Sequence, residues 1–258
     1  MDGDDEKIAV GAGVAFNKKR NDIVSVDKIE KIFIMRENDK FQQLVSRIPE
    51  EHFTISEEII TYAETSMGTK LNEHIHIVLT DHISFAIERV IDGIHLNNKL
   101  LHEIKILYRR EFEIGLWAIN YINEKCQINM LEDEAAYIAL HIHTMKPQGG
   151  DLHQTVRQTT IIKDMVQSIQ EHLPITIKED DISYHRLITH LRFTLTRMNN
   201  YEVHTMDEEM LVMIKKKFPV SFSCAVEVAK ELNEIHEIYF PEQELGYIAL
   251  HIERLRKP

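Results

Sequence analysis

The sequence predicts a mainly all-α protein in which a short β segment precedes two tandem, duplicated five-helix bundles. Three observations predict this fold. The hexapeptide YIALHI occurs at 137–142 and again at 247–252, the apolar residues follow a helical period after about residue 38, and a turn-rich stretch, KPQGGD, lies between the copies at 146–151. A chain of 258 residues is long enough for two ordinary domains. We therefore expect a small N-terminal domain at 1–38 and helical domains at 39–150 and 151–258.

Strand character is concentrated at the N-terminus. Residues 8–16 (IAVGAGVAF) alternate loosely and contain glycine, and residues 23–26 (IVSV) are rich in β-branched side chains. The intervening NKKRND supplies turn residues. This pattern predicts a small β-hairpin.

The first helical half shows coherent helix boundaries. Ser56 is a candidate N-cap, Gly68 and Gly93 are candidate helix ends, and Asn97 or Asn98 is a candidate start. The periodicity predicts helices at about 40–48, 55–67, 73–92, 97–108, 109–125 and 132–145.

The second half has a matching series of helices. Pro241 is placed as a first helical residue would be, directly before the second YIALHI segment. The predicted helices lie at about 153–172, 180–199, 206–217, 222–236 and 242–256.

The duplication preserves histidines as well as apolar residues. The segment from 123 to 142 matches that from 233 to 252 without a gap, and DHISFAIER at 81–89 matches THLRFTLTR at 189–197. Each half therefore carries two histidines on two separate helices, with Phe85 and Phe193 at matching positions. The four histidines are His82, His141, His190 and His251. A single histidine among apolar residues is usually a satisfied buried group, but histidine is not a preferred core residue, so its repetition indicates a function.

Several chemistries could use paired histidines. Metal binding is disfavoured because His74 and His76, like His141 and His143, stand two residues apart and point to different sides of a helix, and no HExxH motif occurs. We therefore expect neither metal nor cofactor, although a histidine-rich metalloenzyme remains an alternative. GxSxG and phosphate-cradling glycine motifs are absent from the sequence. Phosphoryl acceptance by a neutral imidazole fits the pattern and needs little beyond exposure.

Charge and cysteine content limit the partners and the compartment. The formal net charge of −12 excludes nucleic-acid binding over the whole surface, so such a site must be local, and the basic triplet Lys18, Lys19 and Arg20 is the candidate. The two cysteines form no CxxC motif, and no apolar run is long enough to span a membrane. We expect a reduced, cytoplasmic protein without membrane insertion.

Over nearly its whole length the chain resembles the BglG/LicT/SacY-type transcriptional antiterminators of bacteria. The segments LTDHISFAIER, EDEAAYIALHI, YHRLITHLRF and ELGYIALHIER match those that hold the family's phosphorylatable histidines. The resemblance implies that His82, His141, His190 and His251 are phosphorylated. It implies two regulation domains of the sugar phosphotransferase system (PTS), a homodimer, HPr and a sugar-specific EII component as partners, and no enzymatic activity.

The N-terminal segment VGAGVAFNKKRNDIVSVDKIEKIF resembles the back half of the family's RNA-binding module. The resemblance implies that Gly11, Phe16 and the basic triplet contact an RNA antiterminator hairpin. The family pattern has further residues before this segment, where this sequence has MDGDDEK. A regulation-domain sensor without RNA binding is therefore an alternative.

Two arginines are candidates for pairing with phosphate. Arg89 and Arg197 each follow a histidine by seven residues and lie on the same stripe of their helices. Across a helix contact either one can receive a phosphoryl group by charge-assisted hydrogen bonds. The alternative is an ordinary salt bridge.

Overall fold

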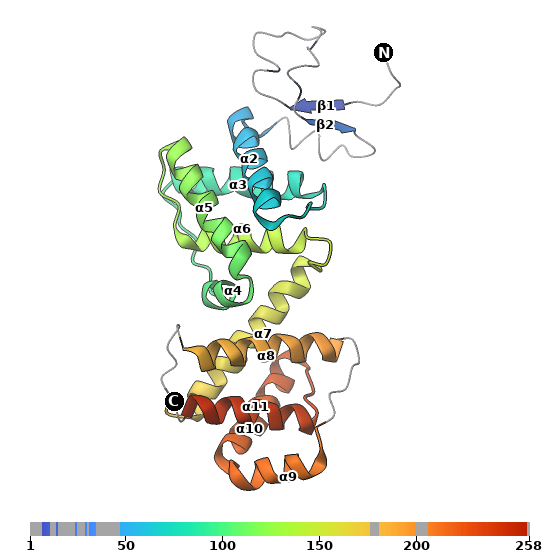
Figure 1. Cartoon of the computed structure of the whole chain (residues 1–258). Helices are drawn as coiled ribbons and strands as arrows, with labels where there is room; N and C mark the ends of the chain where they lie inside the picture. Colours follow the sequence, from blue (N-terminus) through green and yellow to red (C-terminus); the bar gives the residue numbers. More distant parts are fainter. Residues whose placement is uncertain are drawn as a thin grey trace. The chain divides into compact units, whose positions relative to one another are not determined.

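The computed structural model describes residues 7–10, 14, 24, 29, 31–34, 47–175, 181–199 and 206–256 (Figure 1). The chain divides into two compact units, 1–48 and 49–258. The unit at 49–258 holds ten described helices, α2 to α11, with five on each side of the KPQGGD segment. The predicted fold class, a mainly all-α protein with tandem five-helix repeats after a short β segment, is thereby confirmed. The boundaries 1–38, 39–150 and 151–258 stay predictions.

The described part of the first unit contains a two-stranded antiparallel sheet. Strand β1 spans Lys7–Val10 and β2 spans Lys31–Ile34, with Lys7 opposite Ile34 in the register. The predicted hairpin of residues 8–16 with residues 23–26 lies largely outside the described residues and stays a prediction. Within the described residues, β1 pairs with Lys31–Ile34, a partner far along the chain that local sequence pattern does not indicate.

The first five helices follow the predicted series closely. They are α2 Glu50–Met67, α3 Ile75–Ile91, α4 Leu101–Leu107, α5 Arg109–Cys126 and α6 Glu132–Thr144. The candidate helix at 40–48 falls largely outside the described residues.

The second five helices repeat the arrangement. They are α7 Leu152–His172, α8 Ile182–Asn199, α9 Glu208–Lys217, α10 Pro219–His236 and α11 Glu242–Arg256. The pairs α5·α6 and α10·α11 pack closely in their respective halves, as do α3·α6 and α8·α11. The duplication seen in sequence is therefore a duplication of packing.

Two predicted helix boundaries are wrong. Ser56 does not cap α2, which begins at Glu50, and the Ser56 hydroxyl instead donates to the His52 carbonyl within the helix at 2.8 Å. Asn98 does not begin α4, because its side chain accepts from the amide of Leu100 at 2.9 Å and the helix starts at Leu101. In both cases a side chain that can cap bonds to a different part of the backbone.

Other helix ends agree with the expected chemistry. Gly68 ends α2 in the left-handed region at φ 67°, which glycine adopts without steric cost. The equivalent helices α5 and α10 both end on a non-glycine residue in that region, Gln127 at φ 52° and Glu237 at φ 56°. The duplication has thus kept even an unusual backbone conformation.

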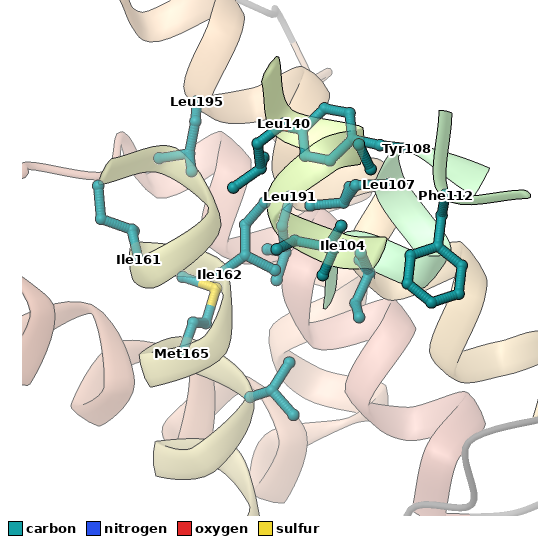
Figure 2. Packing of buried hydrophobic residues seen from close by; sticks show 14 of the residues in the cluster. Ile104, Leu107, Tyr108, Phe112, Leu140, Ile161, Ile162, Met165, Leu191 and Leu195 are labelled. Atoms are coloured by element: carbon teal, nitrogen blue, oxygen red, sulfur yellow. The ribbon is translucent and has the colours of Figure 1, made fainter. Parts of the chain in front are cut away.

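A continuous apolar core connects the two halves (Figure 2). Helix α4 of the first half packs against α7 and α8 of the second, and α6 packs against α7. Ile104 and Leu107 from α4 lie in the same cluster as Ile162 from α7 and Leu191 from α8 (Figure 2). The two halves are therefore in apolar contact as well as joined by the linker.

Among the residues that the structure describes, none of the helices combines the length and apolar character needed to cross a membrane.

Candidate functional site

The four repeated histidines form two pairs, one in each half. His82 on α3 and His141 on α6 have ring centroids 4.9 Å apart, and His190 on α8 and His251 on α11 have centroids 4.8 Å apart. The packing of α3 against α6, and of α8 against α11, brings each pair together. The sequence predicts that the two histidines of each half lie on separate helices, and the structure shows in addition that their imidazole rings are neighbours.

A buried glutamate lies beside each pair. Glu134 on α6 is 3% exposed and its Oε2 lies 3.4 Å from Nε2 of His82; Glu244 on α11 is also 3% exposed and its Oε2 lies 3.7 Å from Nε2 of His190. Neither glutamate was predicted as a site residue from the sequence. The available signal was their identical register in the repeat, seven residues before His141 and His251.

The two candidate arginines hold these glutamates. Nη2 of Arg89 donates to Oε1 of Glu134 at 2.9 Å, and Nη2 of Arg197 donates to Oε1 of Glu244 at 2.8 Å. Each bond joins the two histidine-bearing helices of its half. The Nε atoms of Arg89 and Arg197 are buried and have no hydrogen-bond partner, so each guanidinium keeps a donor to spare. Pairing of these arginines with phosphate stays a prediction.

One difference between the two sites lies four residues after the first histidine. The second site has Thr194, whose hydroxyl donates to Oε2 of Glu244 at 2.9 Å and accepts from Arg197 at 3.1 Å. Because a hydroxyl has one proton, and Thr194 gives it to Glu244, Nε2 of His190 at 3.3 Å must be the donor to Thr194. The first site has Ala86 at this position. There, both Oε2 of Glu134 and Nε2 of His82 are buried and lack a hydrogen-bond partner.

Burial and neighbouring charges shift the pKa values of His141, His251 and Glu134. Burial, with the nearby His82, lowers the pKa of His141 to about 4. Burial, followed by His190 and two arginines, lowers the pKa of His251 to about 4. Burial on its own would raise the pKa of Glu134, but His82 and Arg89 outweigh it and the pKa is lowered. At neutral pH, His141 and His251 are therefore uncharged and each keeps a nitrogen lone pair.

The histidines are partly accessible to solvent. The side chains of His82 and His190 are 15% and 18% exposed, and His141 and His251 are half-buried. Three residues beyond the first histidine of each pair, Phe85 and Phe193 are 56% and 51% exposed. The sites thus lie at a surface with an exposed aromatic residue at matching positions.

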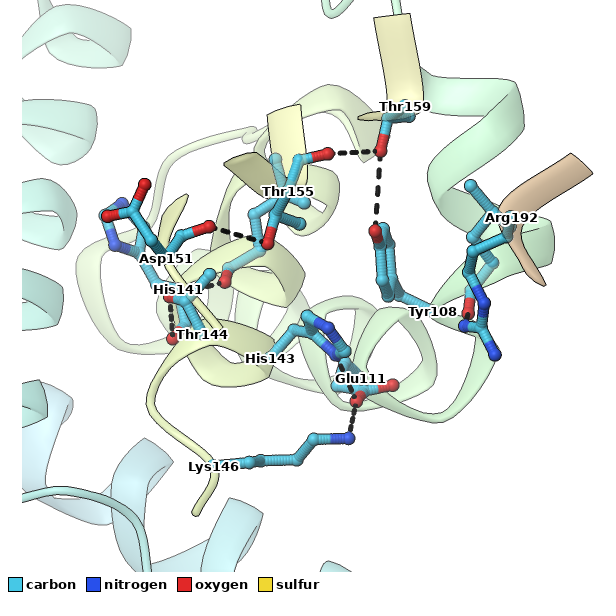
Figure 3. A network of polar contacts seen from close by, with 12 residues as sticks. Tyr108, Glu111, His141, His143, Thr144, Lys146, Asp151, Thr155, Thr159 and Arg192 are labelled. Atoms are coloured by element: carbon cyan, nitrogen blue, oxygen red, sulfur yellow. Dashed lines mark hydrogen bonds and ion pairs between the residues drawn. The ribbon is translucent and has the colours of Figure 1, made fainter. Parts of the chain in front are cut away.

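A second polar cluster lies at the end of α6, close to the start of the linker (Figure 3). Glu111 on α5 accepts from Nδ1 of His143 at 3.1 Å and from Lys146. Burial would raise the pKa of Glu111, but these two hydrogen bonds outweigh it and lower the pKa to about 2. The His143 ring also packs on Tyr108, with centroids 4.2 Å apart.

Tyr108 and the preceding residue, Leu107, make polar contacts with the second half (Figure 3). The Tyr108 hydroxyl lies 3.5 Å from that of Thr159 on α7, and Nη1 of Arg192 on α8 donates to the carbonyl of Leu107 at 3.0 Å. Arg192 stands two residues after His190 on the same helix. Polar contacts therefore accompany the apolar junction between the halves.

Within the described ranges, no group of three or more histidine, cysteine, aspartate or glutamate side chains is arranged to hold a metal ion. The residues expected at an RNA interface lie outside the described residues; they are Gly11, Phe16, Lys18, Lys19 and Arg20.

Comparison with known proteins matches two protein families to this chain. The PRD domain matches residues 57–145 and 163–255, and the CAT RNA binding domain matches residues 1–42. Among similar proteins, the transcription antiterminator LicT of Bacillus subtilis (strain 168) is 35% identical over 98% of this chain and 92% of its own length. The beta-glucoside operon antiterminator of Dickeya chrysanthemi is 32% identical over 97% of this chain and 90% of its own length.

A solved structure, the crystal structure of GlcT CAT-PRDI, is 36% identical in sequence and covers 55% of this chain and 86% of its own, with a TM-score of 0.49.

Proposed function

Because the chain belongs to the family of transcription antiterminators that join a CAT RNA binding domain to PRD domains, we propose that it is a sugar-responsive antiterminator of a bacterial PTS operon. Its activity is controlled by reversible phosphorylation of His82, His141, His190 and His251. The family consists of regulators rather than enzymes, and relatives are named for beta-glucoside and ptsGHI operons.

The observation that carries this proposal is the duplicated histidine pair backed by a buried carboxylate and an arginine. A neutral imidazole attacks the phosphorus of a carrier protein, the carrier's bond to phosphorus breaks, and a P–N bond forms. The proton that the ring gives up goes to the carrier's leaving group or to water. The low pKa values of His141 and His251, both about 4, keep these rings in the reactive neutral form at neutral pH.

The proposed division of labour follows the family. His82 and His141 receive phosphate from a sugar-specific EII component, which inhibits, and His190 and His251 receive it from HPr, which favours the active homodimer. A phosphoryl group adds roughly −1.5 to −2 charges at pH 7. The exposed Phe85 and Phe193 beside the sites support a subunit contact there, because exposed aromatic residues often mark protein interfaces.

The test of phosphorylation is incubation with phosphoenolpyruvate, enzyme I and HPr, with and without the EII component, followed by mapping of acid-labile phosphate. His190→Ala with His251→Ala is expected to abolish labelling by HPr, and His82→Ala with His141→Ala to abolish labelling that needs the EII component. His172→Ala is the matched control, because His172 lies on α7 outside both pairs and its side chain is 34% exposed. Equal labelling of the paired variants and the control contradicts the site assignment.

RNA binding is proposed through Gly11, Phe16, Lys18, Lys19 and Arg20, supported by the CAT match over residues 1–42. Replacement of the triplet 18–20 by alanine is expected to weaken binding to an antiterminator hairpin and to flatten its dependence on salt, because three contacts with phosphate would be lost. The matched control is the same replacement at Lys215, Lys216 and Lys217 on α9. If the unmodified protein binds no hairpin, the alternative, a sensor without RNA binding, is correct.

A further inference from the structure

The two sites hold their carboxylates by different numbers of hydrogen bonds. Glu244 on α11 is bound from α8 twice, by Arg197 at Oε1 and by Thr194 at Oε2, at 2.8 and 2.9 Å. Glu134 on α6 is bound from α3 by Arg89 at Oε1, while its buried Oε2 lies 3.4 Å from Nε2 of His82 without meeting hydrogen-bond geometry. Hydrogen bonds from two side chains therefore join the helices of the second site to its glutamate, and a hydrogen bond from one side chain does so in the first.

A single position accounts for this difference. Thr194 and Ala86 occupy the same place in the repeated segments THLRFTLTR and DHISFAIER, and both are buried, at 0% and 2% exposed. The methyl group of Ala86 can neither donate nor accept a hydrogen bond. The hydroxyl of Thr194 does both, toward Glu244 and from Arg197.

A phosphoryl group at either site competes for the arginine. It adds strong acceptor oxygens and negative charge beside a buried carboxylate, and Arg89 and Arg197 each have a buried Nε without a partner to offer it. At the first site, the turn of Arg89 from Glu134 to the phosphate removes the α3–α6 hydrogen bond and leaves a carboxylate repelled by the new charge. At the second site, the Thr194 hydroxyl still holds Glu244 when Arg197 turns.

We propose that Thr194 determines how the second site responds to phosphate: the α8–α11 tie survives phosphorylation because of its hydroxyl, whereas the α3–α6 tie of the first site, which has Ala86, is broken. This inference rests on the proposed function, in which these histidines carry phosphate. It gives a physical reason for opposite effects of one modification on two domains of the same fold.

The experiment uses the full chain and potassium phosphoramidate, a small donor that phosphorylates imidazole without a carrier protein. Its P–N bond breaks, ammonia leaves, and a P–N bond forms to the histidine ring. Mass spectrometry measures the phosphate on each histidine, and amide hydrogen exchange is followed helix by helix. In the protein without substitutions, phosphorylation should accelerate amide exchange about tenfold or more in α3 and α6, because the loss of one hydrogen bond to a charged group has an effect of about this size. In α8 and α11 it should change exchange by less than about twofold.

Matched variants isolate the hydroxyl. Thr194→Val keeps the shape and removes the hydroxyl, and it should make α8 and α11 respond to phosphate as α3 and α6 do. Thr194→Ser retains a hydroxyl and should behave as the unmodified protein. Ala86→Ser supplies a hydroxyl to the first site and should reduce the response of α3 and α6.

The outcomes distinguish a failure of the role proposed for Thr194 from a failure of the proposed histidine phosphorylation. Equal responses of the two sites in the unmodified protein, or no change in α8 and α11 on Thr194→Val, overturn the role of Thr194 while leaving phosphorylation intact. If none of the four histidines takes phosphate, the proposed function itself fails and this inference fails with it.

Discussion

Arg89 on α3 donates from Nη2 to Oε1 of Glu134 on α6 at 2.9 Å, and this bond fastens together the helices that carry His82 and His141. The carboxylate is 5% exposed as a side chain, whereas the guanidinium is 25% exposed. Such a pair resists separation mainly because each charge left alone would be poorly solvated.

Glu134→Gln is expected to lower the free energy of unfolding by about 1–3 kcal/mol, less than the loss of a fully buried pair because Arg89 is partly solvated. Urea denaturation measures the change. Glu132→Gln is the control, since Glu132 on the same helix pairs with Lys105 at 45% exposure, and we expect a change within about 0.5 kcal/mol. Equal losses of unfolding free energy in the two variants would show that the buried Arg89–Glu134 pair stabilises the protein no more than an exposed pair does.

The pKa values of His141 and His251 predict a loss of stability in mild acid. Both groups have a folded pKa of about 4, against an ordinary value of 6.5. Between these values the unfolded chain binds protons that the folded chain does not, so stability is complete above pH 6.5 and falls as the pH drops toward 4. The expected loss is on the order of 1–3 kcal/mol for each histidine.

Urea titrations at a series of pH values check this window. A variant with His141→Asn and His251→Asn should show a flatter dependence of unfolding free energy on pH between pH 6.5 and 4, while His95→Asn, at an exposed position, should leave this slope unchanged. An unchanged slope in the double variant would mean that the pKa values of these two rings do not differ between the folded and unfolded chain.

Glu111 contributes to stability in a different pH window, because its pKa is lowered to about 2 and its contribution is lost only as the pH falls below its ordinary 4.5.

Gly115 on α5 allows close contact with α6. A Cβ at Gly115 would lie 2.3 Å from the backbone oxygen of Ala135, which cannot move without moving the helix. Gly115→Ala is therefore expected to destabilise by about 1–3 kcal/mol through overpacking, although alanine favours helix by about 1 kcal/mol. Thermal unfolding measures it.

The control for Gly115 comes from the other half. A Cβ at Gly246 would meet the side-chain ends of Leu211 and Met206 at 2.9 Å, and such ends can shift. Gly246→Ala should therefore cost less than Gly115→Ala. A reversed order would show that the α5–α6 contact is looser than the distance indicates.

The helices and the histidine pairs were accessible to sequence reasoning for a physical reason. Apolar periodicity and helix-ending residues such as Gly68 are local signals, and the repeat marked His82, His141, His190 and His251 as unusual for a core. Glu134 recurs in the repeat as Glu244, but this repetition did not mark it as unusual, because an acidic residue in the first turn of a helix is favoured by the helix dipole alone and is usually solvated.

Two other features depended on distant contacts. The pairing of β1 with Lys31–Ile34 joins segments far apart along the chain, which local sequence pattern does not indicate. Ser56 has the chemistry of a cap, yet the helix begins at Glu50 and Ser56 is itself buried within it, next to the core residue Ile55. Propensity at one residue yields to burial of a whole face.

The junction between the halves predicts that damage to α4 reaches α7 and α8. Ile104 on α4 is fully buried in the shared cluster, and α4 packs against α7 and α8 of the second half (Figure 2). Ile104→Ala should cost about 2–5 kcal/mol by leaving a cavity. Because the cavity opens onto both halves, amide exchange should accelerate in α7 and α8 as well as in α4. Ile122→Ala is the control, since Ile122 is also fully buried but lies on α5, which packs against α2, α4 and α6 of the first half. If Ile104→Ala accelerates exchange in the first half alone, the halves unfold independently, and the response of one histidine pair cannot reach the other through this core.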